Sequence, residues 1–566
     1  MTSETSSEVL GSAVGGENGR KKVKLHGRAF YESIGSPKLV LAPMVEQSEF
    51  AWRMLTRSFI PPSEQSNLLC YTPMFHSKMF AEKPKYRESH FQPVKGPLPS
   101  PPTSQLPDEA WYLDGNPELD RPLTVQFCSN NPDDFLQAAK HVAPFCDAVD
   151  LNLGCPQGIA RRGNYGAFLQ EDWTLISSMI KKLHQELDIP VTAKMRCLET
   201  KEKTLEYAKM ILDAGASIIT VHGRRREQKG HNTGLADWNI LRYLRENLPK
   251  ETVIFANGNI LQHGDIEQCL AETGADGVMS AEGNLHDPAI FAAAPPVGQE
   301  GREYWRGKDG KGGYRMDAVM RRYLDIIHKH ALGSPPPERK PLFIPGDPEQ
   351  FDDDTTDGTE EDGPPAKRAK LSKTERKHQK AANPNLSAMQ AHLFHLLRPL
   401  VAEHHDIRDA LAKSRVGMME SYEKVLSMVE KAVKEGLIAY EKEHGEANGD
   451  SLITKEEPPQ PEASEIVEAD DPHLSSLAAV ARCKRPWWVC QPYVRPVPKE
   501  ALEKGSMQLS KKDRKKLEEE ATEVKAVGLE PGGRLEKENL PAVNGIEDGP
   551  PTVEEVEIPK EGVVCG

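Results

Sequence analysis

The sequence predicts an α/β protein whose main domain is a (β/α)8 barrel, the TIM barrel fold. Short apolar runs alternate with amphipathic segments from Lys38 to about Ala293. Eight such units in about 256 residues is the usual size of this barrel. Eight of the runs have the length and composition of buried strands. They are KLVLAP (38–43), LLCYTP (68–73), PLTVQF (122–127), CDAVDLNL (146–153), PVTAKM (190–195), SIITVH (217–222), TVIFAN (252–257) and DGVMSA (276–281).

Most of these strand candidates are followed by a segment whose apolar residues recur with helical periodicity. We therefore expect a barrel domain over 37–298. The Pro-rich stretch 92–118 departs from the rhythm and is predicted to be a surface insertion. The helix candidates are EFAWRMLTRSF (49–59), DDFLQAAKHV (133–142), WTLISSMIKKLHQEL (173–187), TLEYAKMILDAG (204–215) and DIEQCLAETG (265–274).

Helical periodicity returns after the barrel, over 314–333 and again over 386–440. We expect these stretches to form one small helical domain. The segments expected to be disordered or to act as linkers are 1–36, the charged insertion 334–385, the acidic linker 441–475 and the tail 501–566. The basic part of the insertion, PPAKRAKLSKTERKHQK, resembles a nuclear-localisation patch, and a solvated linker is an equally good interpretation.

A basic-aromatic segment, 476–500, precedes the tail. Its centre, RCKRPWWVCQPYVRP (482–496), has four basic residues, three aromatic residues and no acid. Such a composition is typical of nucleic-acid contacts, and it equally fits a tail that is anchored to the barrel. Both interpretations stay open.

Composition limits the class of protein. The chain has 566 residues, 38% of them hydrophobic, and a formal net charge of -14, with a mean hydropathy of -0.58. Such polarity predicts long solvated segments. The negative net charge argues against a basic protein that coats nucleic acid, but it is compatible with a local basic surface. The nine cysteines include no CxxC pair, which predicts neither a disulfide framework nor a metal site.

The N-terminal sequence MTSETSSEVLGSAVGG lacks the apolar core of a signal peptide, and no apolar run approaches the roughly 20 residues of a membrane span. We therefore expect a soluble protein of a reducing compartment, the cytoplasm and/or the nucleus, without a membrane partner. We also expect a monomer.

Polar residues occupy the ends of the predicted strands. In a (β/α)8 barrel the active site lies at the carboxyl ends of the strands, so these residues are the site candidates. Each alone has an ordinary structural explanation, whereas their common position in eight successive units favours a functional one. They are Pro43, Met44, Gln126, Asn152, Cys155, Lys194, Arg196, His222, Arg224, Asn257, Gly258, Asn259, Ala281 and Glu282.

Lys194 lies in an otherwise apolar strand, and an unpaired buried ammonium group is costly. A negatively charged cofactor would supply its partner. The last two strand ends contain glycine and open helices, where backbone N–H groups can hold a phosphate. Together these features predict a phosphorylated ring that becomes anionic, and flavin mononucleotide (FMN) fits. Lys194 and His222 would lie at its pyrimidine edge, and Gln126 would contact its amide edge.

A series of motifs runs along the predicted barrel. They are LAPMV (41–45), VQFC (125–128), DLNLGCPQ (150–157), GNYGAFL (163–169), KMRC (194–197), VHGRRREQKG (221–230), ANGNI (256–260) and SAEGNL (280–285). This series resembles the tRNA-dihydrouridine synthases, which are FMN-dependent barrels with a C-terminal helical domain, and the motifs stand in the family's order. The resemblance covers roughly 38–293 and is greatest to the eukaryotic subfamily that acts on neighbouring uridines, positions 16 and 17, at the start of the D-loop. It implies that the helical domain expected over 314–333 and 386–440 binds tRNA.

The resemblance implies roles for individual residues. Pro43, Met44 and Val45 would pass along the flavin, and Gln126, Lys194 and His222 would bond its ring. Glu282 stands where many bacterial relatives have an arginine, so that backbone N–H groups would have to hold the phosphate. The residues implied to surround the phosphate are Asn257, Gly258, Asn259, Ala281 and Glu282.

Cys155 aligns with the family's catalytic cysteine. Reduction of the C5–C6 bond of uracil needs a hydride at C6, from reduced FMN, and a proton at C5. A free thiol has a pKa of about 8.5 and can donate that proton at neutral pH. The uridine would be flipped out of the tRNA. NADPH or NADH would bind transiently as the reductant. The residues expected to contact the substrate are Asn152, Arg196, Arg224 and Arg226.

Two alternatives remain at this stage. An FMN barrel that reduces a free pyrimidine or an enoate would share the flavin residues but would not need the helical domain. A tRNA-binding chaperone with an inactive barrel would not need Cys155, Lys194 and His222.

Overall fold

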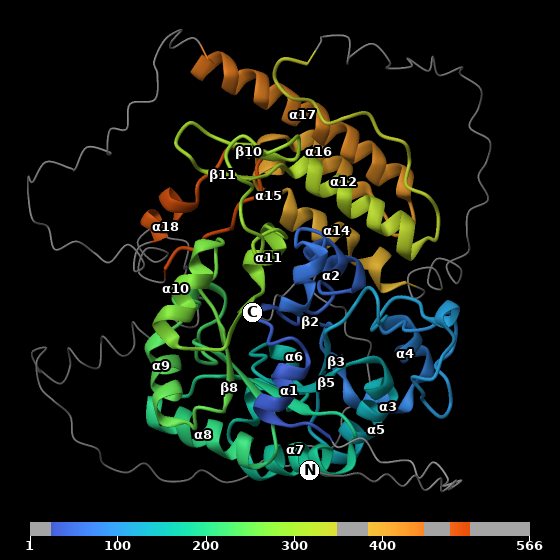
Figure 1. The fold of residues 1–566 in the computed structure, drawn as a ribbon, viewed down its shortest axis with the longest axis vertical. Coiled ribbons are helices and arrows are strands. Elements are labelled where there is room, and N and C mark those ends of the chain that lie inside the picture. Colours follow the sequence, from blue (N-terminus) through green and yellow to red (C-terminus); the bar gives the residue numbers. More distant parts are fainter. Residues whose placement is uncertain (1–23, 348–382, 446–475, 498–566) are drawn as a thin grey trace, which may run out of the picture.

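The computed structural model describes residues 24–347, 383–445 and 476–497 (Figure 1). The expectations for residues 1–23, 348–382, 446–475 and 498–566 lie outside these described ranges. The barrel occupies the lower half of Figure 1, and a group of helices lies above it.

Eight parallel strands form a closed barrel, which confirms the predicted fold class. Each strand pairs with the next along the chain, β1 also pairs with β9, and β2 pairs with β4, so that the sheet has no free edge. A short extra strand, β3 (Phe75–His76), lies beside β4. The barrel strands are β1 (Leu39–Leu41), β2 (Leu68–Tyr71), β4 (Leu123–Cys128), β5 (Ala148–Leu153), β6 (Val191–Arg196), β7 (Ile218–His222), β8 (Val253–Asn257) and β9 (Gly277–Ser280).

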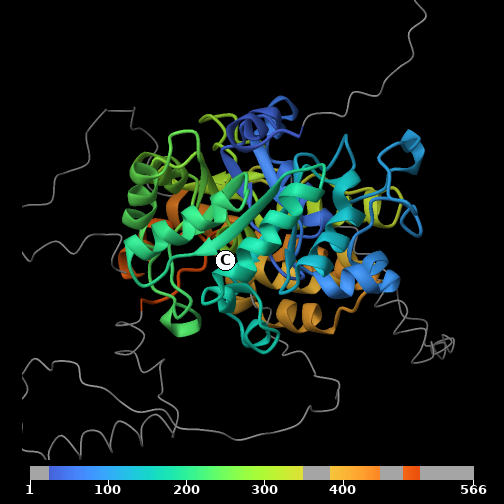
Figure 2. The same ribbon diagram turned by 90° about the horizontal axis from the view of Figure 1, so that it is seen from below.

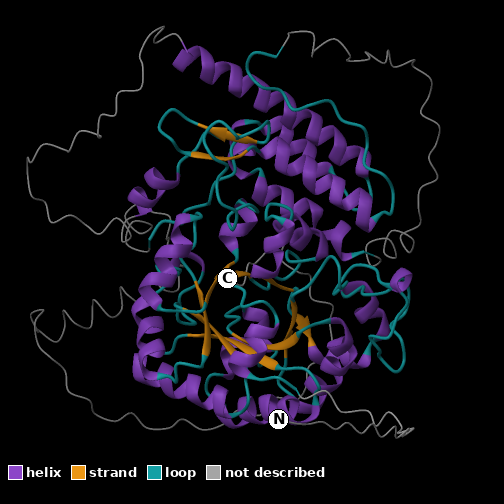
Figure 3. Cartoon of the chain, viewed as in Figure 1, coloured by secondary structure: helices purple, strands orange, loops and turns teal. Residues whose placement is uncertain are grey.

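Helices surround the strands (Figure 3). Several begin at a side chain that accepts a backbone N–H, as at Asn131, Asp172, Thr200 and Asp237. Figure 2 shows the barrel from below, with the later, green units on one side and the early, blue units on the other. The longer barrel helices are α2 (Phe50–Arg57), α5 (Pro132–Val142), α7 (Trp173–Glu186), α8 (Lys201–Asp213), α9 (Trp238–Asn247) and α10 (Gly264–Thr273).

Shorter helices fill the connections. They are η1 (Pro62–Asn67), α3 (Ser77–Glu82), α4 (Pro84–His90), η2 (Asp108–Ala110), η3 (Ala143–Phe145), α6 (Gly158–Arg162), η4 (Gly166–Leu169), η5 (Gly230–Asn232) and α11 (Glu282–His286). Two of them, α6 and η4, follow β5 and form part of the wall around Cys155.

The expected disordered segment 1–36 is wrong for its last residues. Helix α1 (Gly27–Ser33) packs on the amino end of the barrel, where Phe30 and Tyr31 are buried. The hydroxyl of Tyr31 donates to the carbonyl of Asp276 at 3.1 Å. The apolar Ala-Phe-Tyr sequence within a polar stretch explains the difference, because burial of two aromatic rings offsets the entropy of ordering this turn.

The Pro-rich stretch 92–118 is packed more closely than a surface insertion. Phe91 and Val94 are buried, and Val94 pairs with Trp111 in an isolated antiparallel bridge. Asp114 and, just beyond the stretch, Asp120 receive hydrogen bonds from Arg53 of α2 at 2.5 to 2.9 Å.

Arg53 is expected to be essential for stability. Its side chain is 0% exposed, as is that of Asp120, so Arg53→Ala would leave two buried carboxylates without their counter-charge. We expect a loss of about 3–5 kcal/mol of unfolding free energy, measured by denaturant unfolding of the full chain. The control is Arg28→Ala, which breaks a partly exposed pair with Asp276 and should cost no more than about 1 kcal/mol. Equal effects of the two variants would contradict the argument.

The helices above the barrel form one unit, called here the helical domain. Helix α12 packs against α14 and α17, so the two sides of the charged insertion meet in space. The domain contacts α2 and α11, which follow β1 and β9 at the carboxyl end of the barrel. Its helices are α12 (Met316–Ile326), which continues as the π-helical turn η6 (Ile327–Ala331), α14 (Pro384–Leu396), α15 (Arg398–Glu403), α16 (His405–Lys413) and α17 (Met419–Gly445).

Two predicted boundaries are wrong, and one element was not predicted. Residues 334–347 pack on the helical domain rather than being disordered, because Arg339 pairs with Asp325 and Glu423. Helix α17 continues to Gly445, into the predicted acidic linker. An unpredicted hairpin of β10 (Tyr304–Arg306) and β11 (Gly312–Tyr314) links the barrel to the helical domain, and the glycine-rich GKDGKGG sequence forms its turn and second strand.

The basic-aromatic segment is anchored in the structure. It begins with α18 (Ser476–Cys483) and continues as an extended stretch, 484–497, called here the C-terminal strap. Arg482 pairs with Asp265 of α10 at 2.5 Å. The backbone of the strap bonds to Met316 and Tyr314 at 2.9 Å, and Trp488 is buried. Its aromatic residues therefore pack against the hairpin and the helical domain.

Candidate active site at the barrel mouth

The register of the sheet brings the predicted site residues together. Asn152 of β5 is the Cα partner of Lys194 of β6, and His222 of β7 is the partner of both Arg196 and Asn257. Because all these strands are parallel, the residues lie at one level, at the carboxyl mouth of the barrel. The predicted gathering of polar groups on one rim is therefore present.

The turn that carries Cys155 is shaped by Asn152. The side-chain oxygen of Asn152 accepts the backbone N–H of Gly154 at 3.1 Å and that of Cys155 at 2.9 Å. Its amide group donates to Gln126 at 2.8 Å, and Gln126 in turn donates to Asp150 at 2.9 Å. Asn152 was predicted to contact the substrate; in this structure its hydrogen bonds hold the cysteine turn and orient Gln126.

Cys155 is 2% exposed. It lies in a small apolar cluster, separate from the main core, with Cys128, Ala160 and Tyr165. The sequence predicted a thiol that its loop holds over the base rather than in the core, whereas the structure buries it in this second hydrophobic cluster, under the residues that follow it.

Gly166 is a site residue that the sequence reasoning missed. Its φ is +66°, and a Cβ there would lie 2.8 Å from the carbonyl oxygen of Cys155 and 3.0 Å from its Cβ. The neighbouring Ala167 donates its N–H to that same carbonyl at 3.1 Å. The signal was present in the GNYGAFL motif, but the sequence does not reveal that its second glycine touches the cysteine turn.

We expect Gly166→Ala to displace Cys155. The added methyl group has no room and demands a left-handed backbone that alanine disfavours. A displacement of about 1 Å can cost about 100-fold in rate. In an assay of the uridine reduction that the family resemblance implies, turnover should therefore fall at least tenfold while flavin content is unchanged. Gly158→Ala is the matched control, because a Cβ at Gly158 would meet nothing within 4 Å. An active Gly166→Ala enzyme would contradict the role of this contact.

Four basic residues surround the mouth, and three of them are cationic. Lys194 and His222 are 4% and 1% exposed, and Arg196 and Arg224 lie beside them. Arg196 is held by the carbonyl of Gly154 at 2.7 Å. Burial, and then the charges of Arg196, Arg224 and Lys194, lower the pKa of His222 well below its usual value, so its imidazole is neutral.

The tautomer of His222 follows from its neighbour. Nη1 of Arg224 lies 3.0 Å from Nε2 of His222. A guanidinium group only donates, so Nε2 is the acceptor and the proton is on Nδ1. Nδ1 is buried and has no hydrogen-bond partner among the described residues. A ligand acceptor at this point would satisfy it, which is what a flavin ring would provide.

Lys194 has a protein partner that the sequence reasoning missed. Burial raises the pKa of Asp150 to about 6, while hydrogen bonds from Thr192 and Gln126 and the charge of Lys194 oppose the rise. The charge of Lys194 on β6 therefore interacts with a carboxylate on the neighbouring strand β5, and a cofactor is not its only counter-charge. The signal was an acid in the strand that leads to Cys155.

The remaining arginines fasten the loops around the mouth. Arg224, predicted to contact the substrate, donates to the carbonyl of Gly234 at 3.0 Å and to the side chain of Asn259 at 3.1 Å. Arg226, also predicted to contact the substrate, donates to the carbonyl of Ala167 at 3.1 Å. Both bridge loops in this structure.

The predicted phosphate residues lie at the ends of β8 and β9. Gly258 and Asn259 have φ of +115° and +65°, and a Cβ at Gly258 would lie 2.6 Å from Ala236. Asn257 Oδ1 and Ser280 Oγ are buried and lack a hydrogen-bond partner within the described ranges. The mouth therefore has orphan polar atoms, neighbouring cations and a close backbone turn, which together fit an anionic, phosphorylated ring.

Pro43, Met44 and Val45 follow β1 at the same mouth. Met44 is buried, and its backbone N–H donates to the hydroxyl of Ser48 at 3.0 Å. The turn after β1 is therefore fixed, as expected of a wall along a ring.

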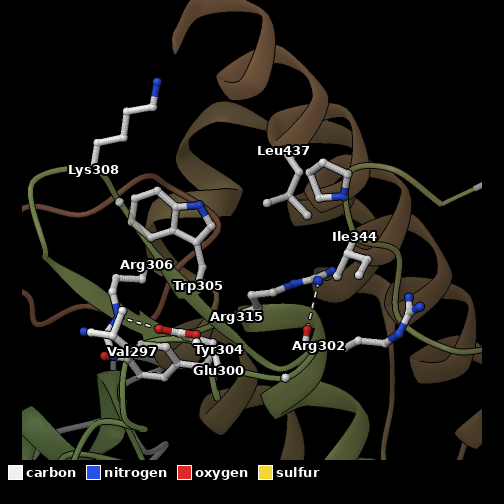
Figure 4. Close-up of a pocket in the computed structure, with 14 residues that line it drawn as sticks. Val297, Glu300, Arg302, Tyr304, Trp305, Arg306, Lys308, Arg315, Ile344 and Leu437 are labelled. Atoms are coloured by element: carbon white, nitrogen blue, oxygen red, sulfur yellow. Dashed lines mark hydrogen bonds and ion pairs between the residues drawn. The ribbon is translucent and has the colours of Figure 1, made fainter. Parts of the chain in front are cut away.

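A cavity of about 420 Å³ lies away from this mouth (Figure 4), beside the β10–β11 hairpin. Three arginines line it, but each has an acidic partner: Arg302 pairs with Asp347, Arg306 with Glu300, and Arg315 with Asp317, at 2.6 to 2.7 Å. Lys308 also lines the cavity and donates to the backbone carbonyl of His444. The pairing of all three arginines with acids distinguishes this cavity from the barrel mouth. In the described parts of the chain, no three potential metal ligands are grouped and no helix has the length and apolarity needed to cross a membrane.

The closed parallel barrel with polar groups at its carboxyl mouth defines a (β/α)8-barrel enzyme. Residues 40–306 match the dihydrouridine synthase (Dus) family. The tRNA-dihydrouridine(16/17) synthase [NAD(P)(+)] of Schizosaccharomyces pombe is 42% identical over 84% of this chain and 92% of its own length. The Saccharomyces cerevisiae protein of the same name is 39% identical over 86% and 90%. A solved structure of mandelate oxidase matches with a TM-score of 0.29 and 14% identity, over 45% of this chain and 67% of that chain. The chain belongs to the dihydrouridine synthase family, whose members are oxidoreductases.

Proposed function

We propose that this protein reduces uridines 16 and 17 in the D-loop of tRNA to 5,6-dihydrouridine, with FMN as its cofactor and NADPH or NADH as the reductant. One observation carries the proposal: the turn that presents Cys155, the cations Lys194 and Arg196, and the neutral imidazole of His222 come from three neighbouring strands and meet at one mouth. The two yeast relatives support the substrate and the reductant, because their names specify tRNA positions 16 and 17 and NAD(P)(+).

The chain's own residues have separate tasks. Bound FMN would supply a hydride to C6 of the uracil ring. Lys194 and the Nδ1–H of His222 would bind the polar edge of the flavin, and Gln126, oriented by Asn152 and Asp150, would contact its amide edge. The thiol of Cys155 would give its proton to C5, so that the C5–C6 double bond becomes single and the thiolate is reprotonated afterwards.

The tRNA would be held outside the barrel. Phosphate contacts position a nucleic acid without reading its sequence, and the helical domain lies on the mouth side through α2 and α11. Arg196 and Arg226 remain candidates for contacts to the flipped base, since each is attached to a loop beside Cys155.

The decisive experiment compares substrates. Purified protein with FMN and NADPH is incubated with unmodified tRNA, with the isolated D-loop stem and with free uridine, and dihydrouridine is mapped by sequencing and mass spectrometry. Dihydrouridine at positions 16 and 17 of tRNA alone is the expected result. Turnover of free uridine would favour a small-molecule reductase, and flavin uptake without any product would favour a tRNA-binding chaperone.

A further inference from the structure

Glu282, the first residue of α11, is paired with an arginine from the far end of the chain. The guanidinium group of Arg495 in the C-terminal strap holds the Glu282 carboxylate with two nitrogens: Nη2 lies 2.7 Å from Oε1 and Nε lies 3.1 Å from Oε2. The two residues are 213 positions apart in sequence. Glu282 directly follows β9 at the carboxyl end of the barrel, so this pair joins the strap to the barrel mouth.

The pair lies in a region of excess positive charge. The charge of Arg224 interacts with both partners. Burial, Arg196 and Arg495 lower the pKa of Arg224 to about 10, and Glu282 opposes them. Arg224 donates to Asn259, which follows β8, at 3.1 Å, and Arg495 is paired with Glu282, which follows β9. Two guanidinium groups thus lie at the ends of the last two strands, where their positive charge favours an anion.

The surrounding backbone is closely packed. A Cβ at Gly283 would lie 2.3 Å from the carbonyl oxygen of Ile260 and 3.0 Å from Ser280 Oγ, so the start of α11 touches the loop that follows β8. The hydroxyl of Ser280 is 2% exposed by residue and has no partner in the described ranges. A buried hydroxyl without a partner, at the end of β9 and against the start of α11, leaves a donor that a polar ligand at this corner would satisfy.

We propose that Arg495 binds the phosphate of the flavin cofactor, and that Glu282 orients it for this task. The inference rests on the proposed function. Nε and Nη2 of Arg495 are occupied by Glu282, whereas Nη1 bonds to no described residue and can donate to a phosphate oxygen. Loops after the last two strands of (β/α)8 barrels commonly hold phosphate. Here a side chain from the C-terminal strap would complete that site.

The proposal gives the strap a function beyond anchoring. The ring of Tyr493 lies under Arg398 of α15, with the guanidinium carbon 3.6 Å from the ring centre, and it is also near His286 of α11. These contacts place Arg495 at the junction of barrel, helical domain and strap. The docked strap and the bound cofactor should therefore stabilise each other.

The test distinguishes binding of the flavin's phosphate from binding of its ring. Flavin-free full-length protein is titrated with FMN and with riboflavin, which lacks the phosphate, and binding is followed by flavin fluorescence. We expect Arg495→Ala to weaken FMN binding about 10- to 100-fold and to leave riboflavin binding unchanged. Arg495→Lys keeps the charge but not the paired geometry and should fall between the wild type and the alanine variant.

Two further variants distinguish phosphate binding from anchoring. Arg482→Ala removes the ion pair between α18, the helix that leads into the strap, and Asp265 of the barrel, and should leave the preference for FMN over riboflavin unchanged. Glu282→Arg combined with Arg495→Ala puts a guanidinium group on α11 itself and should restore most of the FMN affinity.

The outcomes separate the two proposals. If Arg495→Ala leaves FMN binding intact, or weakens both flavins equally, the phosphate role is wrong and the proposed function stands. If Arg482→Ala lowers the preference for FMN as much as Arg495→Ala does, the strap acts only as an anchor. If the wild-type protein takes up neither flavin, the proposed function and this inference both fail.

Discussion

Cys155→Ala should abolish dihydrouridine formation while the purified protein remains yellow. Loss of a general acid typically costs about 10²- to 10⁴-fold. The flavin-binding residues proposed here, Lys194 and His222, lie on β6 and β7 and do not depend on the sulfur. The cysteine turn should also persist, because it is held through backbone N–H groups by Asn152. Nucleoside mass spectrometry of the tRNA and the absorbance of bound flavin measure the two effects.

The neighbouring thiol is the matched control. Cys128 lies in the same small cluster as Cys155 and is also 2% exposed, but no step of the proposed reaction uses it. Cys128→Ala should therefore retain activity within a few-fold. An active Cys155→Ala variant would remove the cysteine from the mechanism, and a colourless one would mean that its turn is needed to hold the cofactor.

The sequence was sufficient to predict the barrel and its mouth. Each strand is a short apolar run buried on both faces, and such runs are visible in the chain without any partner. Once the eight strands are placed, the rule that sites lie at their carboxyl ends selects the residues from Gln126 to Glu282. The position of each residue along the chain was enough to select it, because parallel strands in register bring their carboxyl ends to one level.

The partners of those residues could not be predicted in the same way. The counter-charge of Lys194 comes from Asp150 on the neighbouring strand β5. The space for the turn of Cys155 depends on Gly166. These are contacts between segments, set by barrel closure and loop packing rather than by local pattern. The pair of Glu282 and Arg495 is the clearest example, because nothing in the sequence around Arg495 indicates where that residue docks.

Short ordered stretches in polar surroundings were missed for a related reason. Helix α1 has seven residues, too few for a periodic pattern to emerge, and its order comes from two aromatic rings that find a surface on the barrel. Residues 334–347 are ordered through ion pairs such as that of Arg339 with Glu423. Composition predicts disorder in both cases, and tertiary contacts overcome it.

Lys194→Met should slow reduction of the bound flavin by NADPH about 100-fold, because it removes a preorganised positive charge from the place where negative charge develops. Methionine has nearly the same length and no charge, so packing in the strand should be preserved. Rapid mixing of flavin-loaded protein with NADPH, followed by flavin absorbance, measures the rate. Lys203→Met on the exposed face of α8 is the control for loss of a positive charge and should reduce normally.

The same substitution should change the pH dependence of stability. Lys194 lowers the pKa of Asp150, which burial raises to about 6, so its loss should raise that pKa further. A carboxyl whose folded-state pKa lies above its unfolded value binds protons more tightly when folded, so stability falls as pH rises between the two values. Up to about pH 6 Asp150 is protonated in both folded proteins, so the difference in Tm should stay constant, whereas from pH 6 to pH 8 the Tm of Lys194→Met relative to wild type should decrease. A difference in Tm that stays constant up to pH 8, together with normal flavin reduction, would show that Lys194 neither balances Asp150 nor stabilises the reduced cofactor.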